Sequence, residues 1–238
     1  MSRDEIYAKG GEGQPFEFSE KVAGVFEDMI RRSVPGYELT LTAIEAVAGR
    51  ECNAGTRIYD LGCSLGASTQ AAWRGVRGKG VPVIGIDSSS AMVTRAAHYA
   101  EGLTSCSFEE GDATNFPMQE ASLIVLNFTL QFVPIEEREA LLQRCYDALV
   151  PGGVLYLSEK FVSENPADEE WLRELHWEFK RQQGYSEMEI AGKREAIEKV
   201  LLPESPELHV SRLQGVGFGQ VTRVLQCLNF GSWVARKN

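Results

Sequence analysis

The residues of this chain that are best placed for chemistry surround a glycine-rich turn, Gly62-Cys63-Ser64-Leu65-Gly66, between a predicted strand and a predicted helix. Glycine has no Cβ, so the backbone at such a turn can approach a ligand closely. Asp87 closes the next predicted strand about twenty residues later, where its carboxylate can accept hydrogen bonds from both hydroxyl groups of a ribose. The spacing is not Gly-x-Gly-x-x-Gly, and it therefore favours a nucleoside over a dinucleotide.

Further polar residues follow two other predicted strands. Asp112, with Ala113 beside it, comes after the strand Cys106–Glu109, and Asn127 lies near the end of the strand Leu123–Phe128. The carboxyl ends of parallel strands border the ligand crevice of open α/β sheets, which predicts that Asp112 accepts a hydrogen bond from an adenine amino group and that Asn127 faces the ligand. The alternative is local, because either side chain could instead cap the turn that follows it.

Arg194 is a candidate of another kind, because it lies within the apolar stripe of a predicted helix, four residues after Ile190 and three before Ile197. Ser186 and Glu189 form a capping box that predicts where this helix begins. An arginine held against a core needs a partner anion, since an unpaired buried charge is costly. That partner is either an acidic side chain of the protein or a carboxylate or phosphate of a ligand, bound by two parallel hydrogen bonds.

Nucleophiles and metal ligands give weaker signals. Cys63 has no histidine or basic neighbour within the glycine turn, so we interpret it as a small packing residue whose backbone lines the ligand. The histidines His98, His176 and His209 have no metal-ligand spacing, and we predict surface or packing roles for them and no metal site.

The composition is that of an ordinary globular domain. The 238 residues are 43% hydrophobic and 24% charged, which argues against a disordered chain. A formal net charge of −10 opposes binding to a phosphate backbone, so we predict no direct nucleic-acid partner. Five cysteines without a Cys-x-x-Cys pair, and the lack of a spanning apolar run or a signal-peptide pattern, predict a cytoplasmic protein with reduced thiols and no membrane partner.

The elements that position these residues alternate between strands and helices, which predicts parallel βαβ units. Strands are predicted over Arg57–Leu61, Val83–Asp87, Cys106–Glu109, Leu123–Phe128 and Val154–Glu159, and helices over Ala67–Arg77, Ser90–Glu101 and Ile135–Leu149. The tail, Val221–Leu228 and Gly231–Arg236, is typical of an antiparallel hairpin. Residues before about Phe16 are polar and glycine-rich and are expected to be loose. A helix is expected over Ser19–Ile30, followed by another after Pro35.

The strand and turn, Asp60-Leu61-Gly62-Cys63-Ser64-Leu65-Gly66, resemble motif I of the class I S-adenosylmethionine (SAM)-dependent methyltransferases. Three more specific strings resemble the carboxy-S-adenosyl-L-methionine synthase family: Arg32-Ser33-Val34-Pro35-Gly36-Tyr37, Asn127-Phe128-Thr129-Leu130-Gln131-Phe132 and Leu157-Ser158-Glu159-Lys160-Phe161. The similarity extends from about Phe16 to Ala235.

This resemblance implies an α/β, Rossmann-like class I methyltransferase fold, with a mostly parallel seven-stranded sheet, a C-terminal antiparallel hairpin and an inserted helical cap. We expect a single domain over residues 1–238. Its parts would be N-terminal helices over 16–55, a nucleoside-binding core over 56–160, the cap over 161–207, and the end of a helix with the hairpin over 208–238. The cap carries Trp171, Leu172, Phe179 and Ile190, more apolar surface than a lone segment should expose, which predicts a homodimer.

The resemblance also implies an activity. Members of this family convert SAM and prephenate to carboxy-S-adenosyl-L-methionine (carboxy-SAM), phenylpyruvate and water, without a metal. The product is passed to a tRNA carboxymethyltransferase that modifies a wobble uridine to its 5-oxyacetic acid form. Two other functions stay open on the sequence, an ordinary SAM-dependent methyltransferase acting on a small molecule or an RNA base, and a non-catalytic SAM-binding regulator.

The residue roles that the resemblance implies follow its motifs. Cofactor contacts are expected from Tyr37, Gly62, Cys63, Ser64, Asp87, Ser88, Asp112, Ala113, Asn127 and Arg194. Arg194 would be the catalytic residue, pairing with the newly added carboxylate. Family members often have an amide where this chain has Ser88, whose side chain is shorter.

Overall fold

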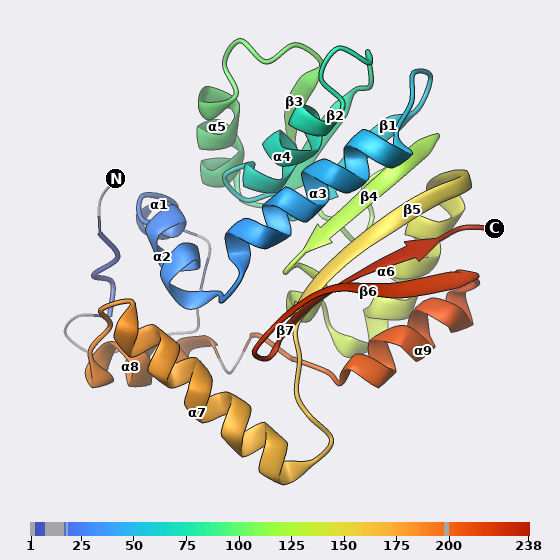
Figure 1. Ribbon diagram of the computed structural model, residues 1–238. Coiled ribbons are helices and arrows are strands. Elements are labelled where there is room, and N and C mark those ends of the chain that lie inside the picture. Colours follow the sequence, from blue (N-terminus) through green and yellow to red (C-terminus); the bar gives the residue numbers. More distant parts are fainter. Residues whose placement is uncertain (1–2, 8–16, 18, 198–199) are drawn as a thin grey trace.

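A seven-stranded sheet forms the centre of the protein in a computed structural model, which describes residues 3–7, 17, 19–197 and 200–238 (Figure 1). The strands are β1 (Arg57–Leu61), β2 (Val83–Asp87), β3 (Cys106–Glu110), β4 (Ala121–Asn127), β5 (Leu149–Lys160), β6 (Gln220–Cys227) and β7 (Phe230–Arg236). Their order in the sheet is β3-β2-β1-β4-β5-β7-β6. The first five strands are parallel, and β7 runs antiparallel to both β5 and β6. The predicted fold class is therefore confirmed.

The helices fall into two layers and a cap. They are α1 (Glu20–Ala23), α2 (Phe26–Ser33), α3 (Tyr37–Glu51), α4 (Ala67–Gly75), α5 (Ser90–Tyr99), α6 (Ile135–Ala148), α7 (Pro166–Gln182), α8 (Glu187–Ile197) and α9 (Pro206–Val216), with a 3₁₀ turn at Leu130–Phe132. Residues of α3 and α4 pack with one face of the sheet, and residues of α6 and α9 pack with the other.

The central strand β4 shows how the sequence produces this arrangement. Successive side chains of a strand point to opposite faces of the sheet. Leu123 and Val125 accordingly join the core on the α3–α4 side, whereas Ile124 and Leu126 join the core on the α6–α9 side. All four are fully buried, as the continuous apolar run of a covered parallel strand predicts.

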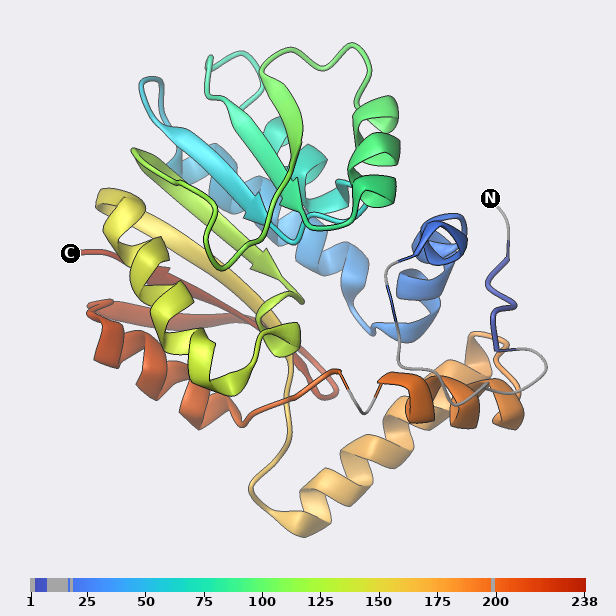
Figure 2. The same ribbon diagram turned by 180° about the vertical axis from the view of Figure 1, so that it is seen from behind.

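The cap is an insertion between β5 and α9 that leaves and rejoins the sheet at one place. An isolated parallel bridge pairs Phe161, directly after β5, with Glu204, two residues before the start of α9. Between these two residues the chain forms α7 and α8, which Figures 1 and 2 both show beside the N-terminal helices rather than within the two layers over the sheet. The cap and α2 are joined by a hydrogen bond of 2.8 Å between His176 Nε2 and the carbonyl oxygen of Ser33.

Most predicted boundaries agree with the structure, and the differences are local. The helix expected over Ser19–Ile30 is two helices, α1 and α2, with a break at Gly24 and Val25. The expectation of a loose N-terminal segment is wrong for Asp4, which is buried and accepts a hydrogen bond of 2.7 Å from the hydroxyl group of Tyr185. Residues 8–16 lie outside the described part of the chain. None of the described helices has the length and apolar character needed to cross a membrane.

Candidate functional site

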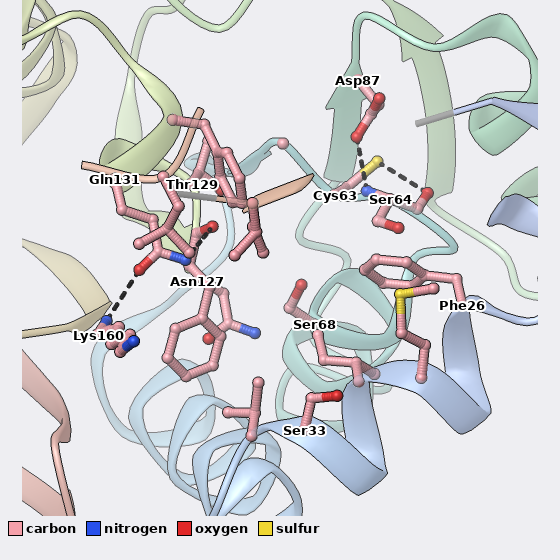
Figure 3. Close-up of a pocket in the computed structure, with 18 of the residues that line it drawn as sticks. Phe26, Ser33, Cys63, Ser64, Ser68, Asp87, Asn127, Thr129, Gln131 and Lys160 are labelled. Atoms are coloured by element: carbon pink, nitrogen blue, oxygen red, sulfur yellow. Dashed lines mark hydrogen bonds between the residues drawn. The ribbon is translucent and has the colours of Figure 1, made fainter. Parts of the chain in front are cut away.

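A cavity of about 390 Å³ lies at the carboxyl ends of the parallel strands and is bounded on its other sides by residues of α2, α7 and α8. Figure 3 shows its polar residues converging from the glycine turn, from the ends of β2, β4 and β5, and from α2. All of the predicted cofactor-binding residues except Arg194 line this cavity. The fold therefore brings together residues that are spread over much of the sequence, although their binding roles remain predictions.

The glycine turn after β1 has a backbone that only glycine tolerates at one position. Gly62 has a φ angle of +75°, and a Cβ at this position would lie 2.5 Å from Cγ2 of Thr129. Ser64 also has a positive φ angle, +50°, and so does Phe128 at the end of β4, at +62°. Non-glycine residues in this conformation are strained and tend to cluster at functional sites. Both of these residues line the cavity.

Asp60, in β1 just before the glycine turn, connects this strand to the start of α4. Its Oδ2 accepts hydrogen bonds from the hydroxyl groups of Ser68, at 2.7 Å, and Thr69, at 2.6 Å, both in the first turn of α4. Burial raises the pKa of Asp60 to about 6, against the hydroxyl donors, which lower it. Asp60 itself does not line the cavity, so it positions the loop and the start of α4.

Asp87 ends β2 at the cavity wall. Its Oδ2 accepts a hydrogen bond of 2.8 Å from the backbone N–H of Ser64, and its Oδ1 accepts one of 2.9 Å from Ser89. Burial raises the pKa of this carboxyl group, against the two N–H donors, which lower it. The carboxylate thus links the glycine turn to the loop after β2, with Ser88 beside it in the wall of the cavity.

Asp112 and Asn127 differ in the hydrogen-bond partners of their side-chain oxygens. Oδ1 of Asp112 accepts hydrogen bonds of 2.8 Å from both the N–H and the hydroxyl group of Thr114, so Asp112 does cap the following turn while lining the cavity. Oδ1 of Asn127 is buried and has no hydrogen-bond partner among the described residues. A buried acceptor without a donor is costly, and a ligand N–H or a cationic group in the cavity would satisfy it.

Cys63 is buried in the cavity wall, and its environment opposes ionisation. Burial, together with the nearby carboxylates of Asp60 and Asp87, raises the pKa of its thiol well above the usual value. A thiol that does not ionise is a poor nucleophile, which agrees with the interpretation of Cys63 as a packing residue.

The wall formed by the cap contains residues that the sequence did not single out. Lys160, Lys180 and Lys193 line the cavity, as does His176, for which only a surface or packing role was expected. Burial, with the charges of Lys180 and Lys160, lowers the pKa of His176 to about 2, so this imidazole is neutral. These three lysines lie on one strand and two helices and form no spacing pattern in the sequence, although Lys160 and Lys180 belong to strings that resemble the family, Leu157-Ser158-Glu159-Lys160-Phe161 and Phe179-Lys180-Arg181.

Arg194 is the exception among the predicted residues. The side chain of Arg194 is exposed and does not line the cavity, and its guanidinium carbon lies 5.6 Å from the ring centroid of Trp177 on α7. The expectation that Arg194 is held against the core is therefore wrong. The reason is the orientation of α8, which buries Lys193 and Ala196 and turns Arg194 to the other side.

Among the residues that the structure describes, no group of three or more histidine, cysteine, aspartate or glutamate side chains could hold a metal ion. His98 is exposed, whereas His209 is buried against Trp233, with ring centroids 5.5 Å apart. These two histidines have the surface and packing roles expected for them.

Comparisons with known proteins agree on the kind of fold and point to one family. Residues 58–153 match the model of a methyltransferase domain family. The chain is 46% identical over 240 residues to the carboxy-S-adenosyl-L-methionine synthase of Shewanella sp. (strain MR-7), with 99% of both chains covered. It is 49% identical to the protein of the same name from Ectopseudomonas mendocina (strain ymp), with 98% of this chain and 97% of that one covered.

Solved structures with a similar fold are more distant in sequence. Human N-acetylserotonin methyltransferase in complex with SAM superposes with a TM-score of 0.62 at 16% identity, covering 95% of this chain and 64% of that chain. A putative methyltransferase from Haloferax volcanii, bound to the activator Trm112, superposes with a TM-score of 0.63 at 18% identity, covering 92% of this chain and 97% of that chain. At this level of identity the likeness concerns the fold alone.

Proposed function

Because this chain belongs to the carboxy-S-adenosyl-L-methionine synthase family, we propose that it carboxylates the methyl group of SAM and takes the carboxyl group from prephenate. The overall balanced reaction converts SAM and prephenate to carboxy-SAM, phenylpyruvate and water. The carboxyl group moves to the methyl carbon, and the methyl proton leaves with the hydroxide that prephenate loses. This proposal is carried by the 46% and 49% identity, over nearly the full length of the chain, to two proteins of that name. A cavity lined by the residues expected to contact SAM supports it.

The cavity has features that suit SAM. The glycine turn leaves no room for a Cβ at Gly62, as expected where backbone must pass close to a ligand. Asp87 is a carboxylate at the wall that could accept hydroxyl groups of the ribose, and Asp112 could accept the adenine amino group. Oδ1 of Asn127, which accepts no hydrogen bond from the described residues, would face the positively charged end of SAM. Tyr37, Ser64 and Ala113 would complete the contacts.

The chemistry supplied by the substrates reduces what the protein has to do. A sulfonium makes its methyl protons acidic, and loss of the carboxyl group from prephenate is driven by aromatisation of the ring. The hydroxide that prephenate releases can take the methyl proton, so a protein base is not required. The protein would then contribute orientation and exclusion of water, which apolar residues in the cavity wall such as Met29, Ile30 and Phe230 favour.

The cellular compartment of the enzyme, its assembly and the use of its product are also proposals. We expect a cytoplasmic homodimer whose product is used by a tRNA carboxymethyltransferase to modify a wobble uridine. The net charge of −10 supports a division of labour in which this chain makes the donor and a different protein binds the tRNA.

The test is an incubation of the purified protein with SAM and prephenate. We expect phenylpyruvate in the ultraviolet spectrum and a new ligand heavier than SAM by the mass of carbon dioxide in mass spectrometry. Omitting either substrate should abolish both signals. If prephenate stays intact while an added methyl acceptor is consumed, the chain is an ordinary methyltransferase. If SAM binds but neither substrate is converted, the chain is a SAM-binding regulator.

A further inference from the structure

Three lysines converge at the cap end of the cavity, and the proposed contacts to SAM do not use them. Lys160 is the last residue of β5, Lys180 lies near the end of α7, and Lys193 lies on α8. All three line the same cavity as Asp87 and Asn127. Figure 3 shows Lys160 and Asp87 on opposite sides of this cavity, with Asn127 between them. The cavity therefore has a second, basic end beyond the proposed position of SAM.

Lys193 has its partners within the protein. Its Nζ lies 3.4 Å from Oδ2 of Asp4 and donates hydrogen bonds to the hydroxyl groups of Ser33, at 2.8 Å, and Tyr185, at 3.3 Å. Both side chains of this ion pair are almost completely buried. Lys193 is thus fixed in place and largely compensated, and it contributes positive potential to the cavity wall.

Lys180 is in a different position. In the described ranges of the chain, no carboxylate lies within ion-pair distance of its ammonium group. Burial, followed by the charges of Lys193 and Lys160, lowers the pKa of Lys180 to about 7. A partly buried lysine facing two other lysines is unfavourable without an anion, so a bound anion would stabilise it.

Aromatic rings lie next to this basic end. His176 is one helical turn before Lys180 on α7, and its ring centroid is 5.0 Å from that of Phe230. The ring of Phe230 is in turn 6.0 Å from that of Phe128. His176 donates from Nε2 to the carbonyl oxygen of Ser33, and being neutral it contributes a ring surface rather than a charge. The lysines and rings together suit an acid with a cyclic hydrocarbon body.

We propose that Lys180 binds a carboxylate of the second substrate, in a subsite framed by Lys160, Lys193 and the ring of His176, and that this subsite selects a cyclic dicarboxylic acid. The inference rests on the proposed function, because it places the carboxyl donor at the end of the cavity that SAM does not use. It also gives a reason for product release. Phenylpyruvate has one carboxylate fewer than prephenate, so it would be bound less tightly by a cluster of cations.

The experiment measures binding without turnover. Protein saturated with S-adenosylhomocysteine, which has no methyl group to react, is titrated with prephenate by calorimetry. We expect Lys180→Met to weaken prephenate binding at least tenfold and to leave the affinity for S-adenosylhomocysteine within twofold of the wild type. Lys180→Arg, which keeps the charge, should recover part of the loss. Lys21→Met is the matched control, because Lys21 is exposed on α1 and does not line the cavity.

The outcomes separate this proposal from the proposed reaction. If the wild type binds prephenate through Lys180 but forms no phenylpyruvate with SAM, the reaction is wrong and the subsite stands. Malonate, a small dicarboxylate without a ring, serves as a second probe: it should bind more weakly than prephenate, and binding of malonate as tightly as prephenate, or in its place, would overturn the selectivity for a cyclic acid. The proposal is overturned if the wild type binds neither acid, if Lys180→Met leaves binding unchanged, or if the variant loses S-adenosylhomocysteine to the same degree.

Discussion

Lys193 and Arg194 are consecutive residues of α8, yet they lie in opposite environments. Lys193 lines the cavity, is 5% exposed and has its ammonium group 3.4 Å from Oδ2 of Asp4, whereas Arg194 is exposed above the ring of Trp177. Neighbouring residues of a helix differ by about 100° around its axis, so α8 presents only one of the two to the cavity. The charge that the cap contributes to the cavity of its own chain is therefore that of lysine.

Asp87 is the residue whose change should affect SAM most directly. Asp87→Ala removes the acceptor proposed for two ribose hydroxyl groups, and hydrogen bonds to a charged group contribute about 1.5–3 kcal/mol each. We expect the affinity for SAM, measured by calorimetry, to fall at least tenfold. Asp87→Asn keeps one oxygen acceptor and should lose less. Asp147→Ala is the control, because Asp147 is exposed and outside the cavity. An affinity unchanged in Asp87→Ala would place the ribose elsewhere.

The side of the cavity formed by the glycine turn and the strand ends could be predicted from the sequence because its determinants are local. The strands β1 and β2 were predicted with the bounds that the structure has, since each apolar run ends at a residue that cannot continue it, Gly62 after β1 and Asp87 at the end of β2. Parallel strands bring such ends to one edge of the sheet, which also placed Asn127 correctly in the cavity wall.

The cap side could not be predicted, because its determinants are distant in sequence. The partner of Lys193 is Asp4, 189 residues away, in a segment whose polar composition suggested that it was loose. On α8, Ile190 and Ile197 define an apolar stripe, and Lys193 and Arg194 lie on opposite sides of it. The hydrophobic pattern therefore does not show which of these two residues is buried. The burial of Ala196 extends the buried face to the side of Lys193. The packing of the cap, rather than the helical pattern, determines that Lys193 is buried and Arg194 is exposed.

Binding of a carboxylate to Lys180 should depend on pH. The pKa of Lys180 is about 7 in the protein alone, and an anion bound beside the ammonium group would raise it. Only the protonated lysine pairs with the anion, so the affinity for prephenate should be highest below pH 7 and fall as the pH rises above that value, by up to tenfold per unit until the pKa of the complex is reached. The other titratable groups facing this site are Lys160, Lys193 and His176.

Calorimetry with S-adenosylhomocysteine present provides the measurement. At pH 7.5, prephenate binding should take up protons, visible as a difference in apparent enthalpy between HEPES and Tris buffers. Lys180→Arg, which stays protonated throughout, should abolish most of this difference and flatten the pH dependence. A wild type whose affinity and enthalpy are independent of pH and buffer between pH 6.5 and 8.5 would contradict the assignment.

Of the four cap residues from which the homodimer was predicted, only Trp171 is exposed, since Leu172 and Phe179 are half-buried and Ile190 is buried; Met188 is a second exposed apolar side chain of the cap. Trp171 on α7 is 62% exposed and Met188 on α8 is 58% exposed. Large exposed apolar groups on one segment are typical of an interaction surface, and a twofold dimer is the commonest assembly. We expect light scattering to give twice the mass of the chain at micromolar concentration. Trp171→Glu should shift the protein towards monomer with little change in melting temperature, since the side chain is not part of the core. A wild-type monomer would refute the dimer.

Arg194 remains the proposed partner of the carboxylate added to SAM, and its position in the structure sharpens the test. SAM lacks that carboxylate, so a guanidinium directed at it should discriminate the product from SAM. Arg194→Ala should weaken carboxy-SAM binding by about 2–5 kcal/mol, the scale for truncating one side of a buried charge pair, and should change SAM binding far less. Arg194→Lys should recover only part of the loss, because an ammonium group cannot make two parallel hydrogen bonds.

Because Arg194 is exposed and outside the cavity of its own chain, the product-specific loss requires that the cap move or that a second copy supply the residue. Carboxy-SAM binding by a mixture of Arg194→Ala and Asp87→Ala, each of which should bind it weakly alone, distinguishes these two routes: tight binding recovered at one site of the mixed dimer means that Arg194 serves the partner's cavity, and no recovery in mixed dimers means that it serves its own. A structural role in the cap would instead lower the melting temperature and weaken SAM and carboxy-SAM equally, and that result would remove Arg194 from the site.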